Sequence, residues 1–442
     1  MIRVLFINPS MPYEVKGHLQ TPLGICYLSS SIADIAITKV IDCNICDNLE
    51  KEIIAFNPDV VGISILTATA KKSLDIVKLV RKVLSYRCVL IAGGIHASTF
   101  PADMLNNGFD YVVRGEGERI IHNLIECISS NKDTYFIRGI SYINTLGQVV
   151  SNPAEKTIDD LDSIPFPDRK DLDLGMYEHE SIITSRGCGF KCFYCSSSHY
   201  WGKQVRFRSV ENVFAELLQL YHNGIRKFYF CDDNFTLSKK RVFDLCNRII
   251  DSSLDIRWSC LTRVDTINYD LLLKMKVAGC TTLSLGIESG LEEFYSKTKK
   301  TSLTTVRKAF AMIRDVGITT RTTWIVGLGK TAEEEYQSLR LIKEILPDQV
   351  SVHCLIPYPN TDAWMYPEKY NLEFDKESID WDIMNMTYSP YILDYIHFKH
   401  ISKEQIIEMI TTIKHELEAF GYDGRTRKFE SFLDNSIIKV IQ

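Results

Sequence analysis

Short apolar segments alternate with helical segments along most of this chain of 442 residues. In residues 1–150 this alternation predicts a doubly wound, Rossmann-like parallel sheet, because each helix returns the chain to the same end of the sheet. The expected strands are 2–7, 39–42, 60–65, 89–92 and 111–114, and the expected helices are 22–35, 49–56, 68–85, 101–107 and 117–130.

A second series of alternating segments begins at residue 181. Six units predict a partial (β/α)6 barrel over 181–375, open on one side to admit a substrate, with its site at the carboxyl ends of the strands. Residues 151–180 are polar and turn-rich and predict a linker, whereas 376–442 predict a helical cap. The expected barrel strands are 181–185, 227–232, 257–262, 282–286, 320–326 and 349–355, and the expected helices are 209–223, 238–252, 268–278, 303–316 and 332–345.

Charge and hydropathy exclude several classes of protein. The net charge of -5 gives no electrostatic argument for nucleic-acid binding. No apolar run is long enough to span a membrane, and the N-terminal residues resemble a strand more than a signal peptide. Most of the 13 cysteines are dispersed and are expected to be small buried residues, including the isolated pair Cys43 and Cys46.

Three cysteines form the most informative motif. Cys188, Cys192 and Cys195 have the spacing C-x3-C-x2-C and directly follow the expected strand 181–185. Three thiolates at this spacing can hold three irons of a 4Fe–4S cluster. Because no fourth cysteine lies nearby, one iron would stay open to a substrate or cofactor, which favours catalysis. Two alternatives remain, a structural zinc site completed by His199 and a chance group of buried thiols.

The cysteine loop resembles the signature of the radical S-adenosylmethionine (SAM) superfamily, in which an aromatic residue, here Tyr194, precedes the last cysteine. The resemblance implies that SAM chelates the open iron. It also implies that the reduced cluster cleaves SAM to methionine and a 5′-deoxyadenosyl radical. An electron donor such as flavodoxin or ferredoxin is then expected, together with a small-molecule substrate. A reducing compartment, the cytoplasm, is the expected location.

Polar residues that follow the barrel strands suit the groups of SAM. Acidic and amide side chains can bind an ammonium group and hydroxyls, and arginine suits a carboxylate. Arg321, on the fifth strand, is the expected carboxylate partner, and the run Lys297–Lys300 predicts a solvated loop. The resemblance implies contacts to the amino group from Asp232, Asp233 and Asn234, to the ribose and carboxylate from Glu288 and Ser289, and to adenine from Val326, Gly327 and Leu328.

The first domain resembles the N-terminal cobalamin-binding domain of many radical SAM proteins. The resemblance rests on the loops 8–10, 64–69, 93–98 and 114–118 at expected strand ends, where glycines let the backbone approach a ligand, and on Thr21–Gly24. The motif D-x-H-x-x-G is absent, and His18 and His96 lack its context, so cobalamin without a histidine ligand is implied. The alternative is a domain that kept the fold and lost the cofactor. The expected cobalamin contacts are Ser64, Gly93, Gly94, Gly115 and Glu116.

Together these features predict a cobalamin-dependent radical SAM enzyme that transfers a methyl group to an unactivated carbon or phosphorus. A non-methylating radical SAM enzyme, such as a dehydratase or cyclase, is the alternative. A third possibility is a module that only transfers electrons or carries cobalamin. The open iron argues against that possibility, because pure electron carriers usually bind all four irons through protein ligands.

Overall fold

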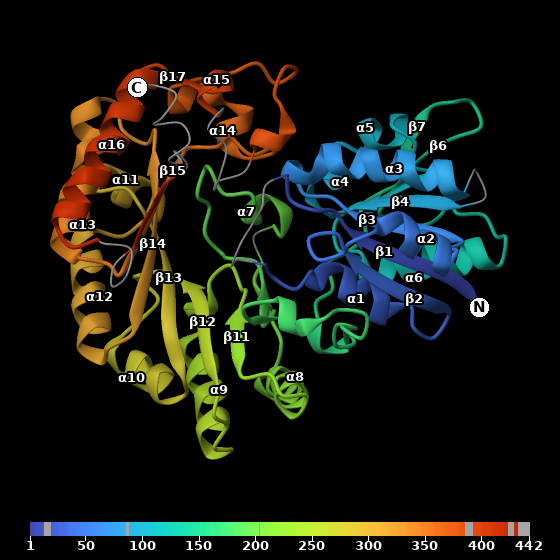
Figure 1. Ribbon diagram of the computed structural model, residues 1–442, viewed down its shortest axis with the longest axis horizontal. Coiled ribbons are helices and arrows are strands. Elements are labelled where there is room, and N and C mark those ends of the chain that lie inside the picture. Colours follow the sequence, from blue (N-terminus) through green and yellow to red (C-terminus); the bar gives the residue numbers. More distant parts are fainter. Residues whose placement is uncertain (13–18, 85–87, 203, 385–391, 423–427, 432–442) are drawn as a thin grey trace. The chain divides into compact units, whose positions relative to one another are not determined.

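The computed structural model describes residues 1–12, 19–84, 88–202, 204–384, 392–422 and 428–431. The chain forms two compact units, Met1–Glu180 and Ser181–Gln442. Figure 1 shows a sheet with flanking helices in each of them.

The first unit contains a seven-stranded sheet with the strand order β2-β1-β3-β4-β5-β6-β7. The pairings from β2 to β5 are parallel, as the sequence predicts, and those of β5 with β6 and β6 with β7 are antiparallel. The strands are β1 (Ile2–Asn8), β2 (Ala36–Asp42), β3 (Val60–Ser64), β4 (Val89–Gly93), β5 (Tyr111–Val113), β6 (Ile140–Ile143) and β7 (Val149–Ser151), and the helices are α1 (Leu23–Ser31), α2 (Leu49–Phe56), α3 (Ala70–Leu84), α4 (Gly94–Thr99), α5 (Pro101–Asn106) and α6 (Glu118–Ser129).

Two parts of this unit differ from the sequence prediction. The hairpin β6–β7 is additional, and its strands of four and three residues are too short to give a periodic signal. The expected loop 93–98 is instead mostly the helix α4, which follows β4 without a connecting loop. Gly94 makes this sharp turn with φ +91°, and a Cβ there would lie 2.8 Å from the carbonyl oxygen of Ile65. Glycine therefore starts the helix here, whereas in most sequences it interrupts one.

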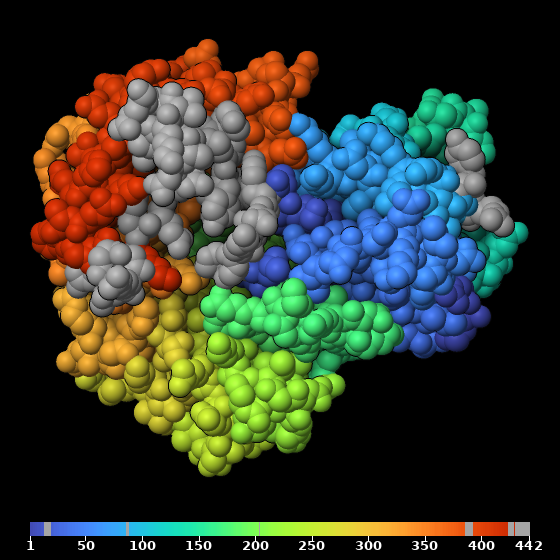
Figure 2. Space-filling view, viewed as in Figure 1, coloured from blue at the N-terminus to red at the C-terminus, as the bar shows by residue number. Residues whose placement is uncertain are grey.

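The polar segment 151–180 packs against the first unit, as its inclusion in that unit requires. Leu172 and Tyr177 belong to the same apolar core as Val4 and Phe6 of β1. The Tyr177 hydroxyl donates a hydrogen bond to Asp42 Oδ2 at 2.9 Å. Figure 2 shows the segment, in green, at the surface of the first unit.

The second unit is the expected partial barrel, with the strand order β18-β15-β14-β13-β12-β11-β8. The pairings from β11 to β15, and of β15 with β18, are parallel. Its main strands are β8 (Glu180–Ile182), β11 (Lys227–Phe230), β12 (Arg257–Thr262), β13 (Cys280–Glu288), β14 (Thr319–Val326), β15 (Gln349–Cys354) and β18 (Lys428–Ser431), and its longer helices are α8 (Val210–His222), α9 (Lys239–Asp251), α10 (Tyr269–Val277), α12 (Leu303–Val316), α13 (Ala332–Ile345) and α16 (Lys403–Ala419).

Short elements complete the second unit. The C-terminal segment is mainly helical through α16, but it also supplies β18, which sequence periodicity did not predict because a four-residue edge strand carries almost no pattern. The short elements are β9 (Ser185–Arg186), α7 (Ser197–Tyr200), β10 (Arg206–Phe207), α11 (Glu292–Phe294), α14 (Asp362–Met365), β16 (Leu372–Glu373), α15 (Ile392–Tyr395) and β17 (His397–Phe398), with a π-helix at Tyr295–Lys299.

The substitution Gly94→Ala tests the turn between β4 and α4. We expect it to lower the unfolding free energy of the first unit by about 2–4 kcal/mol, because it combines a strained φ with a steric clash. Gly115→Ala is the matched control, since Gly115 has φ +81° but no heavy atom within 4 Å of the position that a Cβ would take. Urea unfolding of both variants gives the measurement, and equal losses would contradict the role of the Ile65 contact.

Candidate active site

The cysteine loop leaves the barrel between β9 and α7. Gly187 has φ +96°, and a Cβ there would lie 2.7 Å from the carbonyl oxygen of Gln204, so only glycine fits this turn. The thiols of Cys188, Cys192 and Cys195 are all free. The structure thus presents three unpaired thiols on one loop beside the first strand of the barrel.

Burial keeps two of these thiols protonated at neutral pH. It raises the pKa of Cys188 to about 11 and also raises the pKa of Cys195 above its usual value. A metal ligand must be a thiolate, so binding a cluster would release protons. Within the described ranges, no three His, Cys, Asp or Glu side chains are grouped to hold a single metal ion. In an iron–sulfur cluster each thiolate binds its own iron, so the three thiols need not meet at one point.

Asp232 fastens the segment that precedes the cysteine loop. Its Oδ1 accepts hydrogen bonds from the backbone N–H groups of Thr184 at 2.6 Å and Ser185 at 3.1 Å. Its Oδ2 accepts from the hydroxyls of the same two residues and lies 3.5 Å from Arg241 Nη2. The carboxylate is buried and already well satisfied. These hydrogen bonds give Asp232 a positioning role, and its contact with the amino group of SAM stays a prediction.

The next two residues lie at the same strand end. Asp233 Oδ1 accepts a hydrogen bond from Ser197 Oγ at 2.6 Å, and burial raises the pKa of Asp233. Asn234 is 1% exposed, and its Oδ1 accepts from Thr266 Oγ1 at 3.2 Å. Among the described residues, the Asn234 amide nitrogen Nδ2 is buried without a hydrogen-bond partner. A buried donor of this kind is costly unless a ligand satisfies it, so Asn234 fits a ligand contact.

Glu288 ends β13 in a left-handed conformation, with φ +68°. Its Oε1 lies 3.4 Å from Lys299 Nζ, which also donates to the Gly286 carbonyl at 3.1 Å. Thr323 Oγ1 donates to Glu288 Oε2 at 3.3 Å. Strain and a buried ion pair at a strand end are both frequent at functional sites, which supports the expected placement of Glu288 in the site.

Lys299 is a site residue that the sequence did not reveal. The run Lys297–Lys300 predicted a solvated loop, yet Lys299 is only 6% exposed. The prediction failed because a π-helix, Tyr295–Lys299, turns this one side chain inward, and a run of lysines carries no signal for such a turn. Its Nζ lies 5.8 Å from the centre of the Tyr194 ring. Burial, and next the charge of Glu288, raise the pKa of Tyr194.

Two further expected contacts have local partners. Ser289 is buried, and its Oγ accepts from the Leu291 backbone N–H at 3.2 Å, so it shapes the turn before α11. The expected adenine shelf, Val326–Leu328, is held by Glu335, whose Oε1 accepts from the backbone N–H groups of Gly327 at 3.0 Å and Gly329 at 2.8 Å. His400 Nε2 lies 3.2 Å from the same oxygen. Neither Glu335 nor His400 lies in a loop at a strand end, so the sequence pattern does not point to them.

Arg321 lies deep in the barrel. It is the third residue of β14 and pairs with Ser284, whereas Glu288 pairs with Trp324. On β14, Arg321 thus lies three residues before Trp324, a rise of about 10 Å at 3.3 Å per residue. Arg321 Nε donates to Gln349 Oε1 at 2.8 Å. Arg321 thus lies before the strand end, and its contact with the SAM carboxylate stays a prediction.

In the first unit the expected cobalamin loops lie at the carboxyl ends of β3, β4 and β5. Ser64 ends β3 and pairs with Gly93. The Gly115 backbone N–H donates to Ser98 Oγ at 3.1 Å, and open space surrounds the position of a Gly115 Cβ. Gly94 instead packs against Ile65, and Glu116 Oε2 accepts from the Ile158 backbone N–H at 2.8 Å. Of these residues Gly115 has open space beside it, and the cobalamin contacts expected of Ser64, Gly93, Gly94 and Glu116 stay predictions.

Neither His96 nor His18 is shown as a ligand. His96 is 1% exposed on α4, its ring lies 5.0 Å from that of Phe100, and burial lowers its pKa to about 4. His18 lies outside the described residues.

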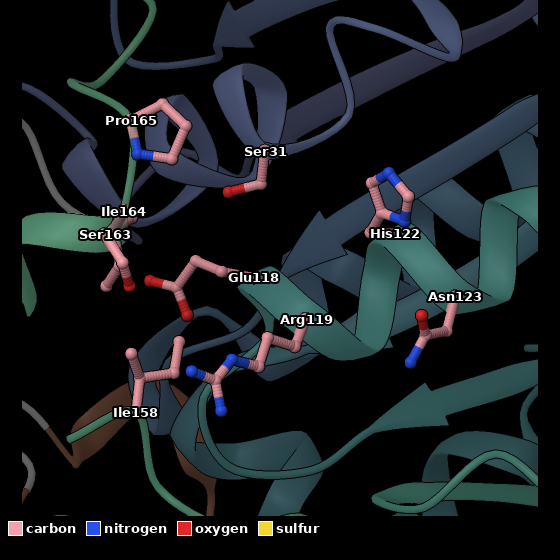
Figure 3. Close-up of a pocket in the computed structure, with 9 residues that line it drawn as sticks. All are labelled: Ser31, Glu118, Arg119, His122, Asn123, Ile158, Ser163, Ile164 and Pro165. Carbon is pink, nitrogen blue, oxygen red and sulfur yellow. The ribbon is translucent and has the colours of Figure 1, made fainter. Parts of the chain in front are cut away.

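A separate pocket of about 310 Å³ lies in the first unit. Figure 3 shows Glu118 and Arg119 of α6 facing Ile158 and Ser163 across it. None of the five expected cobalamin contacts lines this pocket.

Comparison with known proteins identifies the family. Residues 182–342 match the Radical SAM superfamily and residues 15–125 match the B12 binding domain. The chain is 31% identical over 433 residues to the uncharacterized methyltransferase PH0819 of Pyrococcus horikoshii, covering 93% of this chain and 91% of that protein. It is 30% identical over 397 residues to the anaerobic magnesium-protoporphyrin IX monomethyl ester cyclase of Rubrivivax gelatinosus, covering 82% and 69% of the two chains.

The fold is also shared with a solved structure. The radical SAM methyltransferase TsrM of Kitasatospora setae, determined with cobalamin and a 4Fe–4S cluster bound, is 20% identical with a TM-score of 0.73, covering 86% of this chain and 78% of that chain. The chain thus belongs to the radical SAM superfamily, in the group whose members also carry a B12-binding domain. It is an enzyme of that superfamily. Across the described residues, the structure has no helix of the length and apolarity needed to span a membrane.

The substitution Asp232→Ala tests the anchor beneath the cysteine loop. It leaves Arg241 and the donors of Thr184 and Ser185 without their shared acceptor, so we expect a loss of about 3–5 kcal/mol in unfolding free energy and poor cluster loading. Asp244→Ala is the control, because Asp244 forms only an exposed pair with Lys240. Thermal unfolding and iron content are measured for both. If Asp232→Ala has normal stability but binds SAM more weakly, the result would support the direct contact between Asp232 and SAM that the sequence predicts.

Proposed function

We propose that this enzyme is a cobalamin-dependent radical SAM methyltransferase that methylates an unactivated carbon or a phosphorus of a small-molecule substrate. The observation that carries the proposal is the loop of three free thiols beside the first barrel strand, in a chain that also contains a B12-binding domain. When bound, a 4Fe–4S cluster and SAM supply a 5′-deoxyadenosyl radical, and cobalamin supplies a methyl group. The names of PH0819 and TsrM as methyltransferases support the transfer of a methyl group.

The residues of the barrel have distinct roles in this proposal. Cys188, Cys192 and Cys195 hold the cluster, and Asp232 and Asp233 fix the ends of their loop through Thr184, Ser185 and Ser197. Asn234 Nδ2 is a free donor for SAM. Glu288, held by Lys299, accepts hydrogen bonds from hydroxyls of SAM, and the backbone of Val326, Gly327 and Leu328 supports its adenine ring.

In the first unit, Ser64, Gly93 and Gly115 let the backbone approach cobalamin, while Gly94 and Glu116 shape the loops. No histidine from this unit binds cobalt in the proposal, because His96 is buried in the core. An electron donor such as flavodoxin or ferredoxin supplies the reducing electron. We also propose a cytoplasmic location, where a cluster with an open iron stays reduced.

A second candidate function is a radical SAM reaction without methyl transfer. The cyclase of Rubrivivax gelatinosus is nearly as similar to this chain as PH0819 is, which favours keeping this candidate. Labelled methyl-SAM distinguishes the two, because only a methyltransferase moves the label into the substrate.

Replacing Cys188, Cys192 and Cys195 together by alanine tests the cluster. We expect iron binding and reductive SAM cleavage to be lost in the same variant, because three of the four irons lose their protein thiolate. The double variant Cys43→Ala, Cys46→Ala is the control, since this pair lies in the first unit and should leave both properties unchanged. Normal iron content in the triple variant, measured after anaerobic reconstitution, would exclude the assignment.

Gly115→Val tests the cobalamin loop. A branched side chain would fill the open space beside Gly115 and is expected to weaken cobalamin binding at least tenfold while iron content stays normal. Gly147→Val is the matched control, because Gly147 also has positive φ, at +77°, and open space around a Cβ but lies in the turn between β6 and β7. The readout is cobalamin retained after anaerobic reconstitution and gel filtration. Equal retention by the two variants would argue against this loop as the site.

A further inference from the structure

Alternate residues of the barrel strand β14 are buried and half-buried. Along β14 the residues Thr322, Trp324 and Val326 are buried, whereas Arg321 and Thr323 are half-buried. Helices cover the outer face of a βα barrel, so the half-buried set faces the lumen. In a closed barrel such inward side chains form a packed core. Here they stay partly accessible, as an enclosed substrate site requires.

Arg321 presents an unused hydrogen-bonding edge to this lumen. Gln349, its register partner on β15, accepts from Arg321 Nε at 2.8 Å and so orients the guanidinium. In the part of the chain that the structure describes, Nη1 and Nη2 of Arg321 have no hydrogen-bond partner. Neither nitrogen is fully buried, so both are accessible to a ligand. Two parallel N–H donors on a fixed plane match a carboxylate or phosphate.

Among the described residues, no carboxylate forms an ion pair with Arg321. On β11–β15, the described inward side chains at neighbouring levels are neutral: Tyr229, Ser259, Ser284, Thr323 and Ser351. The nearest described inward carboxylate, that of Glu288, is paired with Lys299 and accepts from Thr323, two residues beyond Arg321 on β14. A half-buried cation is costly without a partner, and an anionic ligand offsets that cost.

We propose that Arg321, oriented by Gln349, binds an anionic group of the substrate, a carboxylate or a phosphate, inside the barrel lumen. The inference adds a substrate class to the proposed function and rests on it for the reaction, but anion binding itself needs no catalysis. The carboxylate of SAM has the same chemistry, so the experiment separates these two sources. Arg321 lies three residues before Trp324, the register partner of Glu288, and this position before the strand end favours the substrate.

Inorganic phosphate is the probe, titrated into the cluster-loaded protein and followed by phosphorus NMR. We expect Arg321→Met to weaken phosphate binding at least tenfold. Arg321→Lys should lose part of the affinity, because a lysine cannot bind in a fork. Arg307→Met is the control, since Arg307 forms an exposed pair with Glu344 and should leave phosphate binding unchanged. SAM affinity, measured by equilibrium dialysis, should change less than twofold in Arg321→Met.

Two results would overturn the proposal. The first is wild-type phosphate binding by Arg321→Met, and the second is a tenfold loss of SAM affinity in that variant, which would assign Arg321 to the SAM carboxylate. If Arg321→Met does not fold, Gln349→Leu replaces it, with an expected loss of at least threefold.

The two proposals can fail independently. A wild-type protein that binds phosphate through Arg321 but does not cleave SAM under reducing conditions would reject the proposed function and keep the anion site. If the wild-type protein transfers the methyl label but Arg321→Met does not change phosphate binding, the proposed function is kept and the anion site is rejected.

Discussion

The buried carboxylate of Asp232 is the interaction on which the arrangement of the site depends. It collects four hydrogen bonds from Thr184 and Ser185 and an ion pair from Arg241, so it joins the end of β11 to the segment that starts the cysteine loop. Because loop residues have few backbone hydrogen bonds of their own, such an acceptor decides where the loop begins. The thiols of the loop can hold a cluster only if this starting point is fixed.

Buried carboxylates also hold neighbouring elements together elsewhere around the mouth of the barrel. Glu335 accepts from two glycine amides and holds the Gly327–Gly329 turn, and Glu288 joins Lys299 to the end of β13. In each case a buried carboxylate satisfies donors from a neighbouring element, and a charge-assisted hydrogen bond is stronger than a neutral one. Carboxylates that sequence reasoning would assign to ligands therefore also act as supports, and a single residue such as Glu288 can do both.

Periodicity predicted most of the elements but not the partners of individual side chains. The five parallel strands of the first unit and the barrel strands β11 to β15 follow from runs of buried apolar residues, which the sequence displays directly. Periodicity did not predict the hairpin β6–β7, the strand β18 or the helix α4, because these elements are short or begin at a glycine. Asp232 was placed at the correct strand end, yet its hydrogen bonds to Thr184 and Ser185 join residues 48 and 47 positions apart, a relation that no local pattern records. Lys299 was missed for a similar reason, since one π-turn decides which lysine of the run is buried.

The position of Arg321 shows how register determines chemistry. The sequence places it on the correct strand, but only the pairing with Ser284 and Gln349 shows that it lies several residues before the strand end. At the mouth of the barrel, Asp232, Glu288 and Glu335 are engaged with cations or backbone amides, so the charges there are largely matched. Deeper in the lumen Arg321 is oriented by a neutral amide alone. A ligand that reaches this level meets a positive potential which the mouth does not present, and the barrel can thereby distinguish an anionic substrate from a neutral one of the same size.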